Sequence, residues 1–196
     1  MLATRYYRRM HDAERLYALL DRLGVVLRAD DRQVGRHGAL QPIHRALLRY
    51  LARCNRYSDT PGAAAAYLGQ TKGTVSQSLR VLERRGYVKK RRDARDRRVI
   101  RLELTAKGRR AAGDEPGAAE TAVHGMRRDE IRAAVDLLER LLRGMQEAGG
   151  GRTFGTCATC RHAMEEARGT RCGLTGDALP RAETHRICEL HVWAGQ

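Results

Sequence analysis

Aromatic residues are scarce in this chain: they make up 5% of the sequence, which holds one phenylalanine and one tryptophan, while helix-forming residues dominate. No apolar run approaches the roughly 18 residues that a membrane-spanning helix needs. The first ten residues carry arginines but lack the apolar stretch of a secretory signal. We therefore expect a mostly helical, soluble protein that does not enter a membrane and stays in the cytoplasm.

The chain also lacks the motifs of the common enzyme classes. It has no P-loop, no glycine-rich dinucleotide fingerprint and no evident Ser/His/Asp arrangement. The pair Cys157 and Cys160 has the C-x2-C spacing of a thiol oxidoreductase, but the surrounding sequence lacks the βαβ context which that motif needs. Glu165 and Glu166, beside the cysteines, resemble the base of a metalloenzyme only weakly. We expect that the protein is not an enzyme.

Acidic residues are outnumbered, since 38 Lys and Arg stand against 23 Asp and Glu and give a formal net charge of +15. The excess is concentrated, because residues 84–110 hold 13 Lys and Arg and 3 Asp and Glu, a local charge of +10. Like charges at this density repel one another unless a polyanion neutralises them. A solvated charged face is the simpler explanation of a charge run, but the motif around this one favours a phosphate backbone.

The motif occupies residues 71–110 and contains, in order, a helix, a strand, a charged turn and a second strand. Thr71 can cap the helix, Gly86 ends it, and the turn covers Asp93 to Arg98. One helix face is apolar and would meet a core, which leaves a small, polar and basic face opposite. The order is typical of a winged helix-turn-helix. The apolar face consists of Val75, Leu79 and Leu82.

Two shorter segments upstream complete the helix-turn-helix. A helix from Pro61 to about Leu68 would have Thr60 as its cap and would position the next helix, with a tight turn at Leu68 to Thr71 between them. An amphipathic helix precedes it and ends near Cys54. We interpret Cys54 as a small buried hydrophobe, with an isolated redox-sensing thiol as the alternative. The apolar residues of that first helix are Ile43, Leu47, Leu48 and Leu51.

The recognisable motifs of this region are Thr74-Val75-Ser76, Leu79, Leu82-Glu83, Gly86-Tyr87-Val88, Asp96-Arg97-Arg98, Leu104-Thr105 and Gly108. On these residues, the segment from about Gln41 to Arg110 resembles the DNA-binding domain of the MarR family of bacterial transcriptional regulators. The family's D-x-R wing signature falls on Asp96 and Arg98, so the resemblance implies that Asp96 orients an arginine toward the minor groove. Gln77 differs from the basic residue that is frequent at its position in the family.

These observations predict a sequence-specific DNA-binding transcriptional regulator. The helix from Thr71 to Arg85 would enter the major groove of double-stranded DNA, and the wing from Asp93 to Arg98 would straddle phosphates and the minor groove. An RNA- or ribosome-associated winged-helix zinc protein stays open, because charge does not distinguish duplex DNA from structured RNA. The resemblance also leaves room for a small-molecule effector, although no residue identifies its pocket. The residues expected to contact DNA are Thr71, Lys72, Thr74, Ser76, Gln77, Arg80, Arg84, Arg95, Arg97 and Arg98.

Two leucine-rich stripes flank this region and predict helices that dimerise. They could be ordinary core, but flanking helices around a winged helix are also how the family builds its dimers. A homodimer with a two-fold axis would read a pseudopalindromic operator. Gly113 to Gly117, which lies between the stripes, is expected to be a loop. The first stripe is Leu16, Leu19, Leu20, Leu23 and Leu27, and the second is Ile131, Val135, Leu138, Leu142 and Met145.

The chain changes character at Gly149 to Gly151, which we interpret as a flexible joint between two domains, residues 1–148 and 149–196. The second domain carries 6 arginines and 5 acids, so it lies outside the basic region, but it holds four of the five cysteines. In a chain without a secretory signal, this favours a bound metal over disulfide bonds. The expected ligands are Cys157, Cys160, Cys172 and Cys188, with His191 as the rival fourth ligand.

The nature of the metal is open at the level of sequence. Zinc accepts four thiolates and needs no particular spacing beyond a first C-x2-C pair. An iron–sulfur cluster accepts the same ligands, which are commonly dispersed in sequence, and would make the protein a redox- or oxygen-sensing regulator of the same fold. We take zinc as the cofactor and the iron–sulfur cluster as the alternative. The predicted fold class is mainly α with a small β-wing, dimerising terminal helices and a small C-terminal metal module.

Overall fold

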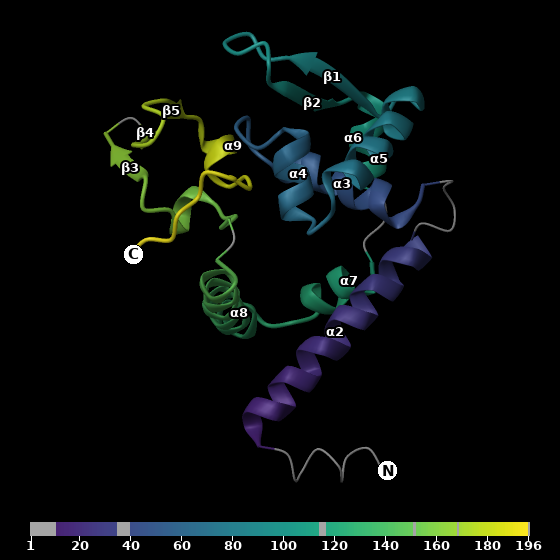
Figure 1. The fold of residues 1–196 in the computed structure, drawn as a ribbon. Helices are drawn as coiled ribbons and strands as arrows, with labels where there is room; N and C mark the ends of the chain where they lie inside the picture. The colour runs from purple at the N-terminus through teal and green to yellow at the C-terminus, as the bar shows by residue number, and fades with distance from the viewer. Residues whose placement is uncertain (1–10, 35–39, 114–116, 151, 168, 196) are drawn as a thin grey trace. The chain divides into compact units, whose positions relative to one another are not determined.

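A computed structural model describes residues 11–34, 40–113, 117–150, 152–167 and 169–195 (Figure 1). These residues form two compact units that we treat separately. In the first unit, helix α2 (Asp12–Val34) packs with helix α7 (Ala118–His124), which the sequence analysis did not single out. The Asp30 carboxylate accepts hydrogen bonds from the backbone N–H groups of Ala118 and Ala119 and so satisfies the first turn of α7. The predicted loop at 113–117 falls partly outside the described residues.

The second unit contains the predicted winged helix. Its elements follow in the expected order: α3 (Pro42–Arg53), α4 (Pro61–Tyr67), α5 (Lys72–Arg84), β1 (Val88–Arg92), β2 (Ile100–Leu104) and α6 (Ala106–Ala112) (Figure 1). Strands β1 and β2 are antiparallel, with Val88 opposite Leu104 and Arg92 opposite Ile100. The apolar residues predicted for α3 and α5 are buried except Ile43, which is partly exposed, so the periodicity located most of this core correctly. Its fully buried members include Leu47, Leu48, Tyr50, Val75, Leu79, Leu82 and Val88.

Local hydrogen bonds set the ends of these helices. The hydroxyl oxygens of Thr60, Thr71 and Thr105 accept from the backbone N–H three residues later and cap α4, α5 and α6. The caps predicted at Thr60 and Thr71 are therefore confirmed. Gly69, between α4 and α5, and Gly86, just after α5, have φ angles of 60° and 73°, which favour glycine and allow the sharp turns at both places.

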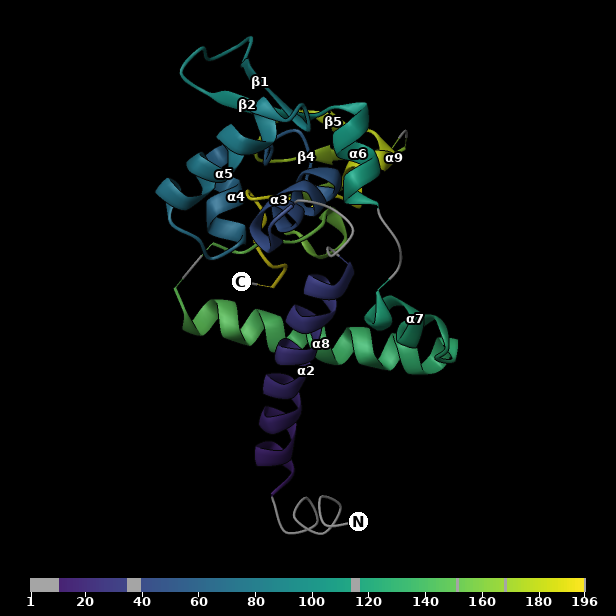
Figure 2. The ribbon, with the colours of Figure 1, turned by 90° about the vertical axis from the view of Figure 1, so that its right-hand side faces the viewer.

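The remaining elements of this unit are α8 (Arg128–Ala148), a 3-10 turn (Cys157–Thr159), β3 (Ala163–Glu166), β4 (Gly169–Cys172), β5 (Ala178–Leu179) and α9 (Arg181–Thr184). Strands β3, β4 and β5 form an antiparallel sheet in that order. We call residues 152–195 the C-terminal module; they lie beside α3 and α4 (Figure 2). Among the described residues, no helix has the length and apolar character needed to cross a bilayer.

Backbone hydrogen bonds join the C-terminal module to the end of α3. The Ile187 N–H donates to the Arg53 carbonyl oxygen and the Ile187 carbonyl accepts from the Asn55 N–H, both at 2.9 Å. Between them Cys54 pairs with Ile187 as an isolated parallel bridge. An edge-on contact between the rings of Tyr67 and Phe154, with centroids 5.3 Å apart, adds an apolar contact. The module is thus packed on the winged helix, although Gly149 marks the end of α8 where the sequence suggested a joint.

Gly108 provides a test of this packing. A methyl group there would overlap the carbonyl oxygen of Tyr87, just before β1, and press on Leu104 of β2. We expect Gly108→Ala to lower the free energy of unfolding by about 1 to 3 kcal/mol, measured by chemical denaturation. Gly144→Ala, in α8, is the matched control: nothing lies within 4 Å of the added methyl, so helix propensity should raise stability by up to about 1 kcal/mol. Equal effects of the two changes would contradict the close approach at Gly108.

Candidate functional site

Helix α5 presents one face to solvent and one to the core. Val75, Leu79 and Leu82 are buried, with exposed fractions of 1% or less. The Thr71 hydroxyl caps the helix and also lies 2.9 Å from the Thr74 hydroxyl, so both threonines have local partners at the exposed N-terminus of α5. The exposed face is therefore small and polar near its N-terminus and basic near its C-terminus. All seven residues predicted on it are exposed: Thr71, Lys72, Thr74, Ser76, Gln77, Arg80 and Arg84.

The wing is a basic hairpin with an ordered turn. The Asp93 carboxylate accepts from the backbone N–H groups of Arg95 and Asp96, which closes the turn. Asp96 accepts from two side-chain nitrogens of Arg98, both at 3.1 Å, so this pair has the contact that the D-x-R signature implies. The hydrogen bonds from Arg98 hold the Asp96 pKa below its usual value. Arg95, Arg97 and Arg98 are all exposed.

Arg101, which the sequence analysis did not single out, joins the wing to the loop between α3 and α4. Its Nε donates to Asp93 at 2.7 Å and its Nη1 donates to Asp59 at 2.8 Å. Nη1 also lies 2.9 Å from the Arg56 carbonyl oxygen and 3.3 Å from that of Tyr57. The Arg101 hydrogen bond and the turn N–H groups lower the Asp93 pKa to about 2. Burial raises the Asp59 pKa, an effect that Arg101 opposes.

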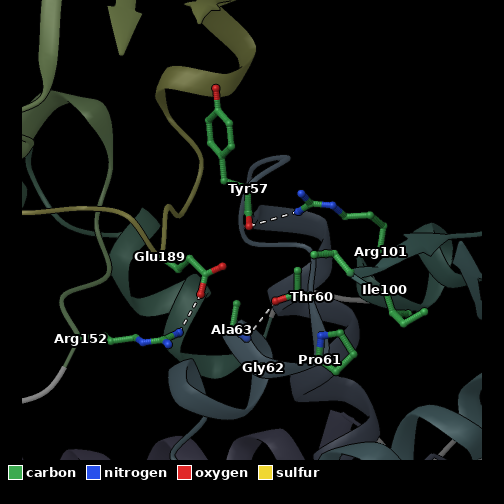
Figure 3. A pocket seen from close by; sticks show the side chains of 10 residues that line it. Tyr57, Thr60, Pro61, Gly62, Ala63, Ile100, Arg101, Arg152 and Glu189 are labelled. Atoms are coloured by element: carbon green, nitrogen blue, oxygen red, sulfur yellow. Dashed lines mark hydrogen bonds and ion pairs between the residues drawn. The ribbon is translucent and has the colours of Figure 1, made fainter. Parts of the chain in front are cut away.

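A cleft of about 420 Å³ lies between this loop, the first turn of α4, strand β2 and the C-terminal module (Figure 3). Arg152 and Glu189 of the module line it and form an ion pair at 2.9 Å. Arg101 and Ile100 line it from the wing. Its charged groups are therefore already paired with protein partners, and the cleft separates the module from strand β2.

The four cysteines predicted as ligands line a single cavity. Its volume of about 20 Å³ corresponds to roughly one water-sized sphere, so it has room for one ion. All four are free thiols with intermediate burial. Two residues of the α3–α4 loop, Asn55 and Tyr57, also line the cavity, as does His162 of the module. Within the described residues, no three His, Cys, Asp or Glu side chains are yet arranged closely enough to hold an ion, so ligation requires the thiols to converge. The four are Cys157, Cys160, Cys172 and Cys188.

Cys188 is the ligand candidate with the most contacts. Its backbone N–H donates to the Gly155 carbonyl oxygen at 2.8 Å, and the N–H of the next residue, Glu189, donates to the Ser58 hydroxyl at 2.7 Å. Burial raises the pKa of Cys188, and it raises that of Cys157 to about 11, with a further contribution from the neighbouring thiols. These two thiols are therefore expected to be neutral without a cation.

His191 and Cys54 lie outside the cavity. The His191 ring is buried, and its two nitrogens lie 3.1 and 3.2 Å from the hydroxyls of Thr159 and Thr153. A methyl group at Gly155 would strike this ring, so a glycine is needed for the ring to pack there. Both ring nitrogens of His191 therefore have hydroxyl groups within hydrogen-bond distance. Burial raises the Cys54 pKa to about 12, which agrees with the prediction of a small buried hydrophobe.

Comparison with known proteins found a family model and solved structures that are similar to the winged helix. Residues 40–99 match the model described as MarR family. The matched residues run from the start of α3 to the tip of the wing and include the whole of α5. This segment is therefore similar to the winged helix of that family. The search of curated proteins gave no match.

Solved structures agree with this fold. FabT of Streptococcus pneumoniae, determined in complex with DNA, is 26% identical with a TM-score of 0.54 and covers 70% of this chain and 99% of its own. MepR of S. aureus in its DNA-binding conformation is 22% identical with a TM-score of 0.57, over 67% and 98% of the two chains. A MarR transcriptional regulator from Methanosarcina mazei is 20% identical with a TM-score of 0.55, over 69% and 99%. These matches support the winged-helix fold that the sequence predicts.

Proposed function

From the similarity of residues 40–99 to the winged helix of the MarR family, we propose that the protein is a sequence-specific regulator of transcription that binds double-stranded DNA. The observation that carries the proposal is the exposed polar face of α5 beside the basic wing, both held by buried apolar residues. The α5 face supplies Gln77 and Arg80, which can form bidentate contacts with adenine and guanine in the major groove. Two structures of this fold, FabT and MepR, were each determined in a complex with DNA.

The wing supplies the electrostatic part of the proposed interface. Asp96 fixes the Arg98 guanidinium, whose side chain is 91% exposed, so the charge is oriented yet free to meet a phosphate or the minor groove. The strand β1 adds exposed Lys89, Lys90, Arg91 and Arg92. Counterion release at these cations would supply much of the affinity, and α5 would supply the sequence preference.

The two parts of the interface have different signatures in a binding assay. We expect Gln77→Ala and Arg80→Ala to change which duplex is selected from a random library and to cost about 1 to 3 kcal/mol on the parent operator. Arg95→Ala and Arg98→Ala should weaken binding to all duplexes and reduce the salt slope by about 1 each.

Arg132→Ala on α8 removes an exposed charge outside both elements and serves as the control. Equal losses on random DNA and operator for the α5 variants would exclude base readout. Displacement of the operator by structured RNA at equal concentration would favour the ribosome-associated alternative instead.

We also propose that the protein is a homodimer that binds a pseudopalindromic operator. In α8, Val135, Leu138, Leu142 and Met145 have exposed fractions between 45% and 65%, which is unusual for four apolar residues at heptad spacing. Helix α2 likewise exposes the leucines of the first stripe at 40% to 53%, except Leu20. A second copy of the chain would cover these stripes.

A charge in the α8 stripe tests the dimer. We expect Leu138→Glu to give monomers in sedimentation and to abolish operator binding, because the carboxylate would be buried without a partner between two helices. The monomer should fold, since Leu138 is 51% exposed within one chain. Arg132→Glu introduces the same side chain on the exposed face of the same helix and should stay dimeric. A dimeric Leu138→Glu variant would place the interface elsewhere.

We further propose that Cys157, Cys160, Cys172 and Cys188 hold one zinc ion. The proposal is supported by the four free thiols that line one small cavity and by the C-x2-C pair among them, although the thiols have to converge to bind an ion. Bound zinc would offset the charge of four thiolates and cross-link the module. The same donor set would accept an iron–sulfur cluster, which is the alternative.

Elemental analysis tests the metal site. We expect protein purified without oxygen to be colourless and to contain one zinc per chain, and Cys157→Ser to lose the metal. Cys54→Ser is the matched control, because Cys54 is buried outside the cavity, and it should keep its zinc. Iron, sulfide and visible absorption would assign the cluster instead, while a metal-free parent with four reduced thiols would refute the site.

A further inference from the structure

The loop between α3 and α4, residues 54–59, is held by the C-terminal module on one side. The Asn55 backbone N–H donates to the Ile187 carbonyl oxygen at 2.9 Å, and the Tyr57 hydroxyl donates to Asp177 at 2.7 Å. The Ser58 hydroxyl oxygen accepts from the Glu189 backbone N–H at 2.7 Å. Five of the six loop residues therefore contact the module, because Cys54 pairs with Ile187 and Arg56 donates to Glu183 and Ala178 as well.

Cys188 lies at the centre of these contacts. The residue before it, Ile187, is bridged to Cys54, and the residue after it, Glu189, is bonded to Ser58. Any shift of the Cys188 backbone therefore pulls on both ends of the loop. Among the four cysteines that line the cavity, Cys188 is the one whose two sequence neighbours both bond to the loop.

The wing holds the same loop from the other side. The Leu102 backbone N–H donates to the Asp59 carbonyl oxygen at 2.7 Å, in addition to the three contacts of Arg101 with the loop. No hydrogen bond or ion pair runs directly between the module and residues 88–104 in the described part of the chain, and the cleft of Figure 3 lies between them. Arg101 attracts Glu189 and Arg95 attracts Asp177 across this space, but the hydrogen-bonded connection between the cysteine cavity and the wing runs through the loop.

We propose that metal occupancy of the cysteine cavity regulates DNA binding through this loop. With the ion bound, the thiolates fix Cys188, Cys188 fixes the loop, and the loop holds Arg101 and the Asp93 turn in the conformation that meets DNA. Without the ion, Cys188 and the loop become mobile and the wing loses its fixed position. The inference rests on the proposed zinc site and adds a regulatory role to it. A shift of the population between a fixed and a mobile wing would couple the metal site to the DNA-binding site.

Operator binding by the full chain, loaded with Zn²⁺ or stripped with a chelator, measures the coupling. We expect the parent to bind its selected operator about 5- to 150-fold more tightly with zinc than without. Arg101→Gln should bring this ratio close to 1, because the donors to Asp93 and Asp59 are lost. Tyr57→Phe, which removes one hydroxyl and leaves the fold intact, should lower the ratio part of the way. Arg98→Ala is the control: it should weaken both forms and keep the parent ratio.

Hydrogen exchange supplies a readout that does not depend on DNA. On zinc removal, we expect faster exchange at the amides of Asp93 and Leu102, which bond to Val99 and Asp59, and unchanged exchange at Val75 and Leu79 in α5. Faster exchange throughout α5 would mean general unfolding and would overturn the proposal.

The possible outcomes distinguish failure of this inference from failure of the proposed DNA binding or of the proposed zinc site. One outcome is a parent protein that binds both zinc and operator, with operator affinities that agree within twofold with and without zinc and with unchanged hydrogen exchange in the wing. That result would overturn the regulation and leave the proposals of DNA binding and of the zinc site standing. If the Arg101→Gln variant keeps the parent's ratio of operator affinity with and without zinc, the coupling does not run through Arg101. A chain that binds DNA but neither zinc nor iron refutes the metal site together with this inference.

Discussion

The Arg101 guanidinium is the contact on which the position of the wing depends. A two-stranded hairpin is marginally stable alone, so the wing needs support from the rest of the domain. Arg101 gives it by donating to Asp93 in the turn and to Asp59 and two carbonyl oxygens in the α3–α4 loop. The ion pairs are partly buried, with side-chain exposures near 20%, so solvent screens them less than the exposed Arg98–Asp96 pair.

The C-terminal module depends on the winged helix for its core. Its 44 positions between 152 and 195 bury few large apolar side chains, among them Phe154, Leu179, Ile187 and Trp193. A unit of this size rarely buries enough apolar surface to fold alone and commonly uses a metal or a partner surface. Phe154 packs on Tyr67 of α4, and the Trp193 indole donates to Gln146 of α8. The docking that stabilises the module therefore also brings its cysteines against the loop that holds Arg101.

The proposed DNA interface divides recognition between two chemistries. On α5 the exposed residues are mostly short, and Gln77 and Arg80 are the long side chains at its middle, so few bases can be read directly. The wing and β1 carry most of the positive charge and act on any sequence. A change in the position of the wing alone would therefore alter the affinity for DNA more than the sequence preference. Metal occupancy of the cysteine cavity, as proposed, would act in this way.

Much of the winged helix was determined by the sequence itself. The caps at Thr60 and Thr71, the turn at Gly69, the buried face of α5 and the Asp96–Arg98 pair all involve residues within a few positions of one another, where periodicity and turn chemistry act directly. The four cysteines were also recognised as a set from their spacing. Tertiary structure decided the rest. The bonds from Arg101 to Asp59 span 42 residues and those from Glu189 to Ser58 span 131, and no local pattern encodes such partners. No local pattern encodes the contacts of the His191 ring with the Thr153 and Thr159 hydroxyls either, nor the packing of the module on α3 and α4. Each of these depends on surfaces that meet only in the folded chain.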